Sequence, residues 1–269
     1  MEEDRPSATA EGAATLRAAH QVLDDPRVLE DPIAVRLIGA ERAAALRSET
    51  RLRAHRLRHL RAFVAVRGRY AEDELARAVG RGVRQYVVLG AGLDTFAYRN
   101  PGPAHVFEVD HPATQAWKRQ RLREAGIAIP ASLTFVPVDF ERQTLAEGLA
   151  AARFDRGRPA FFSWLGVTVY LTRKAVMETL RLVSSSTVAG SGIVLSFVVS
   201  RSPIAARTAA IGEPWLTLFD PGALADDLRA MGFGPVEHLP PAEINRRYFA
   251  DRSDGLRVAS SGHMMKAEV

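Results

Sequence analysis

Short apolar runs alternate with amphipathic stretches over most of the chain. The apolar runs, which are typical of buried strands, cover residues 85–92, 104–110, 133–140, 159–171, 192–200 and 256–267. Between them, residues 114–126, 142–152, 173–183 and 221–233 have the spacing of helices, with glycine or proline near several of their ends. Repeated strand–helix alternation predicts an α/β fold, a doubly wound and mostly parallel sheet with helices on both faces.

The first part of the chain has a different pattern. Residues 13–65 are predicted to be helical, interrupted by two acid–proline breaks within DDPRVLEDPIAVRLIG at 24–39, and a further helix is predicted over 71–79. We therefore expect an N-terminal helical cover over residues 1–80, part of the same domain as a core over 81–269. Residues 201–219 are long and irregular, which predicts a loop over the site.

Composition narrows the function classes. The 269 residues carry a net charge of +5 and contain no cysteine, which excludes disulfides, thiolate catalysis and cysteine-ligated zinc. Apolar runs stay shorter than the roughly 18 residues of a membrane span, and the acidic N-terminus lacks a secretory pattern, so we expect a cytoplasmic protein and no membrane partner. The basic residues are nearly all arginine, which reflects coding bias more often than a nucleic-acid surface. The seven histidines are scattered, and no metal site is expected.

The segment YVVLGAGLDTFAYR, residues 86–99, runs an apolar strand into two glycines. Ligands of parallel sheets bind beyond the carboxyl ends of the strands, and Gly90 and Gly92 would let the backbone there approach a ligand closely. The next strand ends at Asp110, twenty residues after Gly90, the offset at which an acid can accept hydrogen bonds from a ribose. Alternatively, the glycines form only a strand-to-helix turn and Asp110 is a turn residue.

A third strand ends in VDF. Asp139 could accept a hydrogen bond from an adenine amino group while Phe140 packs against the ring, although Asp139 could instead be the N-cap of the next helix. A glycine turn and acids on successive strand ends together predict a nucleoside-binding pocket. Thr95 stands where a dinucleotide fingerprint has its third glycine, and Asp94 would repel a pyrophosphate. A cationic ligand such as S-adenosylmethionine suits these acids better than a dinucleotide.

These motifs resemble a known family. The strings VVLGAGLDTFAYR, VFEVDHPATQAWKRQRL, VPVDF, GVTVYLTRKAV, LEDPIAVRLIG and GEPWLTLFDPGALADDLRAMGF are similar to those of the leucine carboxyl methyltransferases and bacterial polyketide O-methyltransferases. The resemblance runs from about residue 28 to the C-terminus and implies a Rossmann-like class I methyltransferase that binds S-adenosylmethionine. It implies that Gly90, Ala91 and Gly92 line the methionine portion, that Asp110 holds the ribose, and that Asp139 and Phe140 contact the adenine.

Two features of the cofactor site follow from the resemblance. It implies that Arg67 or Arg69, within RGRY, pairs with the cofactor carboxylate, a pairing that can be bidentate. The sequence departs from the family at Leu165, where a glutamate is common before the G…YL segment. A contact to the cofactor's amino group is therefore expected to be missing, or to come from another residue.

Methyl transfer needs mainly the alignment of a nucleophile behind an activated methyl group. A carboxylate acceptor needs no base, whereas a phenol benefits from one, and His111 and Tyr170 are candidates near strand ends. The sequence favours an O-methyltransferase with a small-molecule acceptor, and the resemblance implies an acceptor of polyketide type in secondary metabolism. The alternatives are a protein or peptide carboxyl methyltransferase, and a nicotinamide-dependent oxidoreductase or silent nucleoside-binding protein.

Overall fold

The computed structural model describes residues 7–48, 57–99, 102–139 and 143–269. In chain order its helices and strands are α1 (Ala8–Leu23), α2 (Pro32–Leu37), α3 (Ala40–Ser48), α5 (Arg58–Gly80), β1 (Gln85–Leu89), η1 (Phe96–Tyr98), β2 (His105–Asp110), α6 (Pro112–Glu124), β3 (Leu133–Pro137), α7 (Leu145–Ala151), β4 (Ala160–Trp164), η2 (Thr168–Tyr170), α8 (Arg173–Ser185), β5 (Gly192–Val198), α9 (Pro203–Ala210), α10 (Pro221–Ala230), β6 (Val236–Leu239), α11 (Pro241–Tyr248) and β7 (Gly262–Glu268).

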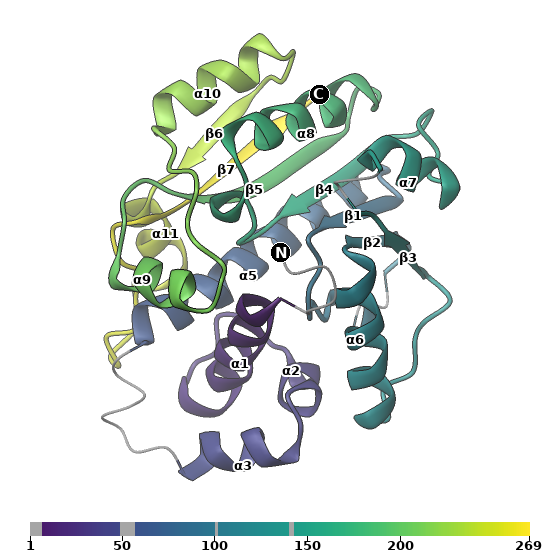
Figure 1. Cartoon of the computed structure of the whole chain (residues 1–269). Coiled ribbons are helices and arrows are strands. Elements are labelled where there is room, and N and C mark those ends of the chain that lie inside the picture. Colours follow the sequence, from purple (N-terminus) through teal and green to yellow (C-terminus); the bar gives the residue numbers. More distant parts are fainter. Residues whose placement is uncertain (1–6, 49–56, 100–101, 140–142) are drawn as a thin grey trace.

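The strands form one sheet in the order β3-β2-β1-β4-β5-β7-β6 (Figure 1). The first five strands of the chain run parallel, and β7 is antiparallel to both of its neighbours, β5 and β6. This confirms the predicted doubly wound, mostly parallel sheet. The chain order reverses at β1, where β2 lies on one side and β4 on the other, and ligands of such sheets bind at this point.

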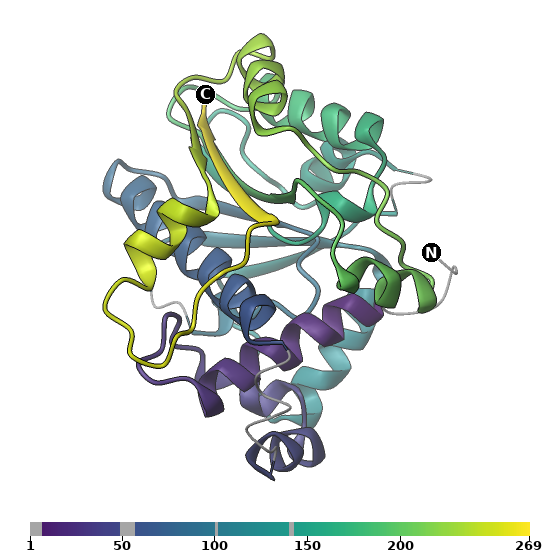
Figure 2. The same ribbon diagram turned by 90° about the vertical axis from the view of Figure 1, so that its left-hand side faces the viewer.

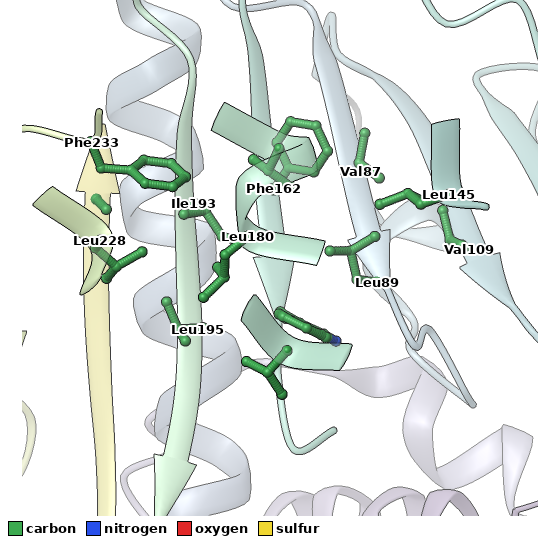
Figure 3. Close-up of a cluster of buried hydrophobic side chains, with 14 of the residues drawn as sticks. Val87, Leu89, Val109, Leu145, Phe162, Leu180, Ile193, Leu195, Leu228 and Phe233 are labelled. Carbon is green, nitrogen blue, oxygen red and sulfur yellow. The ribbon is translucent and has the colours of Figure 1, made fainter. Parts of the chain in front are cut away.

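Helices cover both faces of the sheet. Helices α7, α8 and α10 bury one face through a cluster that includes Phe162 and Leu180, part of which is labelled in Figure 3. Helices α5 and α11 bury the opposite face, where Tyr70 and Ile244 are both fully buried. Burying a side chain such as Phe162 contributes about 1.5–3 kcal/mol, so these two layers fix the strands firmly.

The last helix of the predicted cover is longer than the sequence indicated. The helix predicted over 71–79 is the second half of α5, which continues through Gly68 without a break. A side chain at position 68 would meet Leu29 at 3.2 Å, so glycine serves close packing here instead of ending the helix. Since α5 packs on the sheet, it belongs to the layer that supports the core strands; the division of the chain at residue 80 remains a prediction.

Three further segments differ from the sequence-based expectation. Residues 201–219 contain α9, whose N-cap Ser202 accepts a hydrogen bond from the Ile204 amide, so the prediction of a loop throughout was wrong. The last strand begins at Gly262, because residues 256–261 lack ladder partners. Strand β6 and helix α11 were not anticipated, since four residues of mixed polarity give little periodic signal.

Helices α1, α2 and α3 lie together beyond the sheet, next to α6 (Figures 1 and 2). The fully buried carboxylate of Asp31 joins them to the loop after β1. It caps α2 through the Ala34 amide at 3.0 Å, accepts from the Thr95 hydroxyl at 2.5 Å and lies 2.8 Å from Arg17 Nε of α1. A single side chain therefore connects two cover helices with the glycine-containing loop.

A second buried group attaches α1 to α5. Asp24 receives two hydrogen bonds from Arg61, at 2.7 and 2.8 Å, and lies 2.8 Å from Nδ1 of His20. Burial by itself would raise the pKa of Asp24, but the hydrogen bonds from His20 and Arg61 outweigh it and the pKa lies below its ordinary value. Because Nε2 of His20 accepts from the Val28 amide, the neutral ring carries its proton on Nδ1 and donates it to Asp24.

The role of Asp31 is testable through stability. Asp31→Ala leaves Arg17 and Thr95 without their acceptor and should lower the free energy of unfolding by about 3 kcal/mol. The matched control is Glu30→Ala, which removes only an exposed contact with Arg27 and should cost less than about 1 kcal/mol. Urea denaturation of both variants measures the difference, and equal losses would show that Asp31 does not hold the cover.

Candidate functional site

A cavity of about 2170 Å³ lies beyond the carboxyl ends of the central strands. Its floor is formed by the ends of β1, β2 and β4, one wall by α5, and its cover by α1 together with the segment from 202 to 216. Figure 2 shows α1 beside α9 at this end of the molecule. The residues that line it therefore come from segments far apart in the sequence.

The glycine turn after β1 admits close neighbours from the protein itself. Gly90 has φ +65°, and a Cβ there would lie 2.4 Å from Val167 Cγ2. Gly92 has φ +47°, and a Cβ there would lie 3.1 Å from the Ala10 Cβ of α1. Glycine is required at both positions for conformation and for space. Ala91, between them, also lines the cavity.

The carboxylate of Asp110 joins the end of β2 to this turn. It accepts hydrogen bonds from the Gly92 amide at 2.6 Å and from the His111 amide at 2.7 Å, and it faces the cavity. Burial raises its pKa, and the two backbone hydrogen bonds oppose that shift. Each carboxylate oxygen can accept a further hydrogen bond, so Asp110 remains able to bind a donor in the cavity.

Glu108 does not share this position. It lies two residues before Asp110 on β2, 2.6 Å from Lys118 of α6, and both side chains are 1% exposed. Burial raises the pKa of Glu108 to about 7, although Lys118 lowers it. This carboxylate is therefore a structural partner of Lys118, and Asp110 is the acid of β2 that reaches the cavity.

The third strand contributes Asp139, which lines the cavity. The alternative that Asp139 caps the next helix is wrong, because Thr144 caps α7 and forms a capping box with Glu147. Asp139 therefore does not cap α7, and its contact with adenine stays a prediction. Phe140 lies outside the described residues.

Arg67 and Arg69 have different surroundings. Arg67 lines the cavity, and its guanidinium packs so closely on Gly166 that a Cβ there would lie 2.3 Å from Nη1. Among the described residues it has no hydrogen-bond or ion-pair partner, and burial lowers its pKa to about 10. Arg69 projects to the surface, 2.8 Å from Asp73, and is not among the cavity residues. An enclosed, unpaired guanidinium favours an anionic group in the cavity.

The cavity end of β4 is apolar where the family pattern has glutamate. Leu165 lines the cavity and packs against the buried cluster that contains α5. Asp94 also lines the cavity; one of its oxygens accepts from the Phe96 amide at 2.8 Å, and its charge acts on Arg67. Asp94 is accordingly a carboxylate close to Arg67 that a cationic group in the cavity could approach.

His111 and Tyr170 both line the cavity. His111 is the N-cap of α6, and its Nδ1 accepts from the Ala113 amide at 3.2 Å. That leaves the proton of the neutral ring on Nε2, so the ring can donate but has no free acceptor. Burial raises the pKa of Tyr170, so its hydroxyl stays protonated near neutral pH and cannot take a proton from an acceptor. Neither geometry favours the base role that the sequence suggested.

The sequence did not reveal how the cover is fastened over the cavity. The Glu213 carboxylate, just after α9, accepts hydrogen bonds from the Ala8 amide at 2.7 Å, the Thr9 amide at 3.2 Å and the Ser7 hydroxyl at 3.2 Å. A contact between segments about two hundred residues apart has no local sequence signal. The described residues contain no group of three or more histidine or acidic side chains placed to hold a metal ion. No helix in the described part of the chain is long and apolar enough to cross a membrane.

Sequence comparison gives consistent matches. The family model described as leucine carboxyl methyltransferase matches residues 10–184. The Bacillus subtilis (strain 168) protein YktD, provisionally named an S-adenosyl-L-methionine-dependent methyltransferase, is 36% identical over 215 residues, 75% of this chain and 70% of that protein. The Frankia alni protein FRAAL3718, with the same provisional name, is 34% identical over 190 residues, 68% and 66% of the two chains.

Solved structures support the fold. A DUF574 family protein of Streptomyces avermitilis superposes with a TM-score of 0.59 at 15% identity, covering 94% of this chain and 96% of its own. A protein of Thermobifida fusca, provisionally described as a methyltransferase, gives 0.60 at 18% identity, covering 99% and 96%. At such identities the likeness shows the fold alone.

The close contact between Gly90 and Val167 is testable by a double-mutant cycle. Gly90→Ala should lower the free energy of unfolding by roughly 1–2 kcal/mol through left-handed backbone strain. Overpacking against Val167 should lower it by about a further 1–3 kcal/mol. Position 126 has φ +63° and open space around it, so Gly126→Ala should lower the free energy of unfolding through backbone strain alone. Adding Val167→Ala should recover stability in the Gly90 variant. Additive losses in urea denaturation would show that the two residues do not share this space.

Proposed function

Because the chain belongs to the leucine carboxyl methyltransferase family and is an S-adenosylmethionine-dependent methyltransferase, we propose that it transfers the methyl group to an oxygen of a small molecule. Bound S-adenosylmethionine supplies an activated methyl group. The protein's task is to hold the cofactor and align the acceptor, and alignment of this kind lowers a barrier by about 7–11 kcal/mol. The family assignment excludes the two alternatives of a nicotinamide-dependent oxidoreductase and a silent nucleoside-binding protein.

One observation carries the proposed cofactor placement: the guanidinium of Arg67 lines the cavity and has no partner in the part of the chain that the structure describes. Removing an arginine from water without an anionic partner is costly, and a carboxylate relieves that cost through two charge-assisted hydrogen bonds. The cofactor carries such a carboxylate on its methionine portion. We therefore assign Arg67, and not the exposed Arg69, as its partner.

The remaining assignments follow around the cavity. The Gly90–Gly92 turn accommodates the methionine portion, Asp110 accepts from the ribose hydroxyls, and Asp139 accepts from the adenine. Asp94 binds the ammonium group of the cofactor. In the family a glutamate is common at the position of Leu165, and the leucine side chain has no carboxylate for this contact. Acids of this kind next to a sulfonium and an ammonium stabilise the bound cofactor by charge attraction.

The small-molecule acceptor is supported by the way the cavity is covered. Helix α1 and the 202–216 segment, joined through Glu213, extend across the cavity on the side away from the sheet. An acceptor that fits between them and the sheet is compact. A protein or peptide carboxyl group, the family-based alternative, would have to bring a chain past this cover. A role in secondary metabolism, with a polyketide-type acceptor, is part of the same proposal.

The type of acceptor is decided by a labelling experiment. The protein is incubated with S-adenosylmethionine carrying a tritiated methyl group and a lysate of the organism that encodes it. We expect label in molecules that pass a small-pore filter, retained after treatment with base because methyl ethers resist hydrolysis. Base-labile label in the protein fraction would instead establish carboxyl methylation of proteins and overturn the proposed acceptor.

The Arg67 assignment predicts opposite effects on stability and binding. Arg67→Met removes a partly buried charge that has no partner among the described residues, so the ligand-free protein should gain about 1–3 kcal/mol in free energy of unfolding. The same change should weaken binding of S-adenosylhomocysteine at least tenfold, because the lost charge-assisted hydrogen bonds are each worth roughly 1.5–3 kcal/mol. Arg69→Met, the matched control, should leave binding unchanged. Calorimetric titration and urea denaturation measure both quantities.

5′-Methylthioadenosine, which has the nucleoside but no amino-acid portion, separates the residues. Its affinity should be unchanged in Arg67→Met. It should fall together with that of S-adenosylhomocysteine in Asp110→Ala, since Asp110 contacts the ribose of both. Equal weakening of the two ligands by Arg67→Met would place that arginine elsewhere in the site. Saturable binding of NADH with no binding of S-adenosylhomocysteine to the wild type would overturn the cofactor assignment itself.

A further inference from the structure

The part of the cavity away from the glycine turn is bounded by apolar side chains. Leu60, Phe63 and Val64 project from α5, and across from them lies a cluster around η2 and α9 that includes Trp215 and Ile204. The Phe63 ring lies against the start of β7, where a Cβ on residue 262 would be 2.8 Å from it. An acceptor that enters this part of the cavity exchanges water for hydrocarbon, which disfavours a permanent charge.

The arginines around the cavity add to this argument. Arg17 pairs with Asp31, Arg42 with Glu11 and Arg99 with Glu72. Arg67 is the arginine assigned to the cofactor, and Arg207 is exposed on α9. Among the described residues, the enclosed part of the cavity thus offers an acceptor carboxylate no unpaired cation of its own. A neutral acceptor fits better, and a neutral hydroxyl needs help to lose its proton.

His59, at the start of α5, also lines the cavity and has its tautomer fixed by the backbone. Its Nδ1 lies 2.9 Å from the carbonyl oxygen of Arg257, so Nδ1 must carry the proton and donate it. The lone pair of the neutral ring is then on Nε2. Arg58 Nε donates towards Nε2 at 3.5 Å, a long contact that is consistent with this nitrogen being the acceptor.

The two side chains that the sequence suggested as bases are less suited to accept a proton. The lone pair of His111 is occupied by the Ala113 amide, and burial raises the pKa of Tyr170. His59 combines a hydrogen-bonded Nδ1, an acceptor Nε2 and a position next to the apolar wall of Leu60 and Phe63. Histidine is also the side chain that most often serves as a general base.

We propose that the acceptor is a neutral, largely apolar phenol-type hydroxyl compound and that His59 is its general base; this rests on the proposed function. The acceptor's oxygen gives its proton to Nε2 of His59 and forms the new bond to the methyl carbon, whose bond to sulfur breaks with its electron pair. Arg58 and the Arg257 carbonyl are the groups that contact the imidazole in the described structure. The carbonyl holds the ring in place and stabilises the imidazolium that forms.

Proton transfer to His59 is measurable without methyl transfer. The probe is 4-nitrophenol, whose neutral and ionised forms absorb at different wavelengths, added to the protein saturated with S-adenosylhomocysteine. In the wild type, the bound probe should be more ionised than the free probe at the same pH. In His59→Gln the apolar wall should make the bound probe less ionised than the free probe. His105→Gln, a histidine outside the cavity lining, is the matched control and should behave like the wild type.

Methyl transfer to a panel of phenols and matched benzoates supplies the second readout. The wild type should methylate phenols in preference to benzoates. His59→Gln should reduce kcat about 10²–10⁴-fold near pH 7 with the affinity for S-adenosylhomocysteine unchanged. The deficit should shrink above about pH 10, where the phenol ionises unaided.

Each other outcome overturns the proposal. Equal ionisation of the bound probe in wild type and His59→Gln, or a deficit that does not depend on pH, removes His59 as the base. Preference for benzoates, or no binding and no methylation of phenols by protein that binds S-adenosylhomocysteine, removes the acceptor class while the proposed function stands. Failure to bind S-adenosylhomocysteine would instead remove the proposed function.

Discussion

The buried carboxylate of Asp31 is the interaction on which the shape of the site depends. The carboxyl end of a parallel sheet is an open edge, and it becomes an enclosed cavity only when something covers it. Asp31 fastens α1 and α2 to the loop after β1 through Arg17 and Thr95. Because these partners are themselves enclosed, water competes weakly for them, and the cover helices are held at one distance from the glycine turn.

The site keeps a charge that the fold does not neutralise. Most arginines near the cavity are paired with carboxylates, whereas Arg67 is enclosed beside Gly166 and has no such partner in the described structure. A fold selected for stability alone would have an apolar residue there. The unfavourable desolvation of this charge is explained if the carboxylate of the cofactor pairs with it on binding. The glycine turn is also specialised, because the positive φ of Gly90 and Gly92 lets Val167 and Ala10 approach its backbone closely.

Much of the fold was predictable because its signals are local. The strands β1 to β5 are short apolar runs, and α6, α8 and α10 have clear helical periodicity with proline or glycine at their ends. The predictions were wrong, or an element was missed, where the local sequence signal was weak or fitted more than one structure. The helices predicted over 13–65 and 71–79 are joined in α5, where Gly68 permits Leu29 to pack, and α9 is a short helix in an otherwise irregular stretch.

By itself, the sequence determined the succession of strands β1 to β5 with helices α6, α7, α8 and α10, the glycine turn with Asp110 at its predicted offset, and the family, since each is encoded in residues close together along the chain. The tertiary structure placed Arg67 in the cavity lining and Arg69 at the surface, paired Glu108 with Lys118, and brought Glu213 to the start of α1 and His59 to the Arg257 carbonyl. These outcomes depend on which side of an element faces the cavity and on contacts between distant segments. The packing of helices against the sheet determines the orientation of each element and the contacts between distant segments, and neither can be predicted from a local pattern of residues.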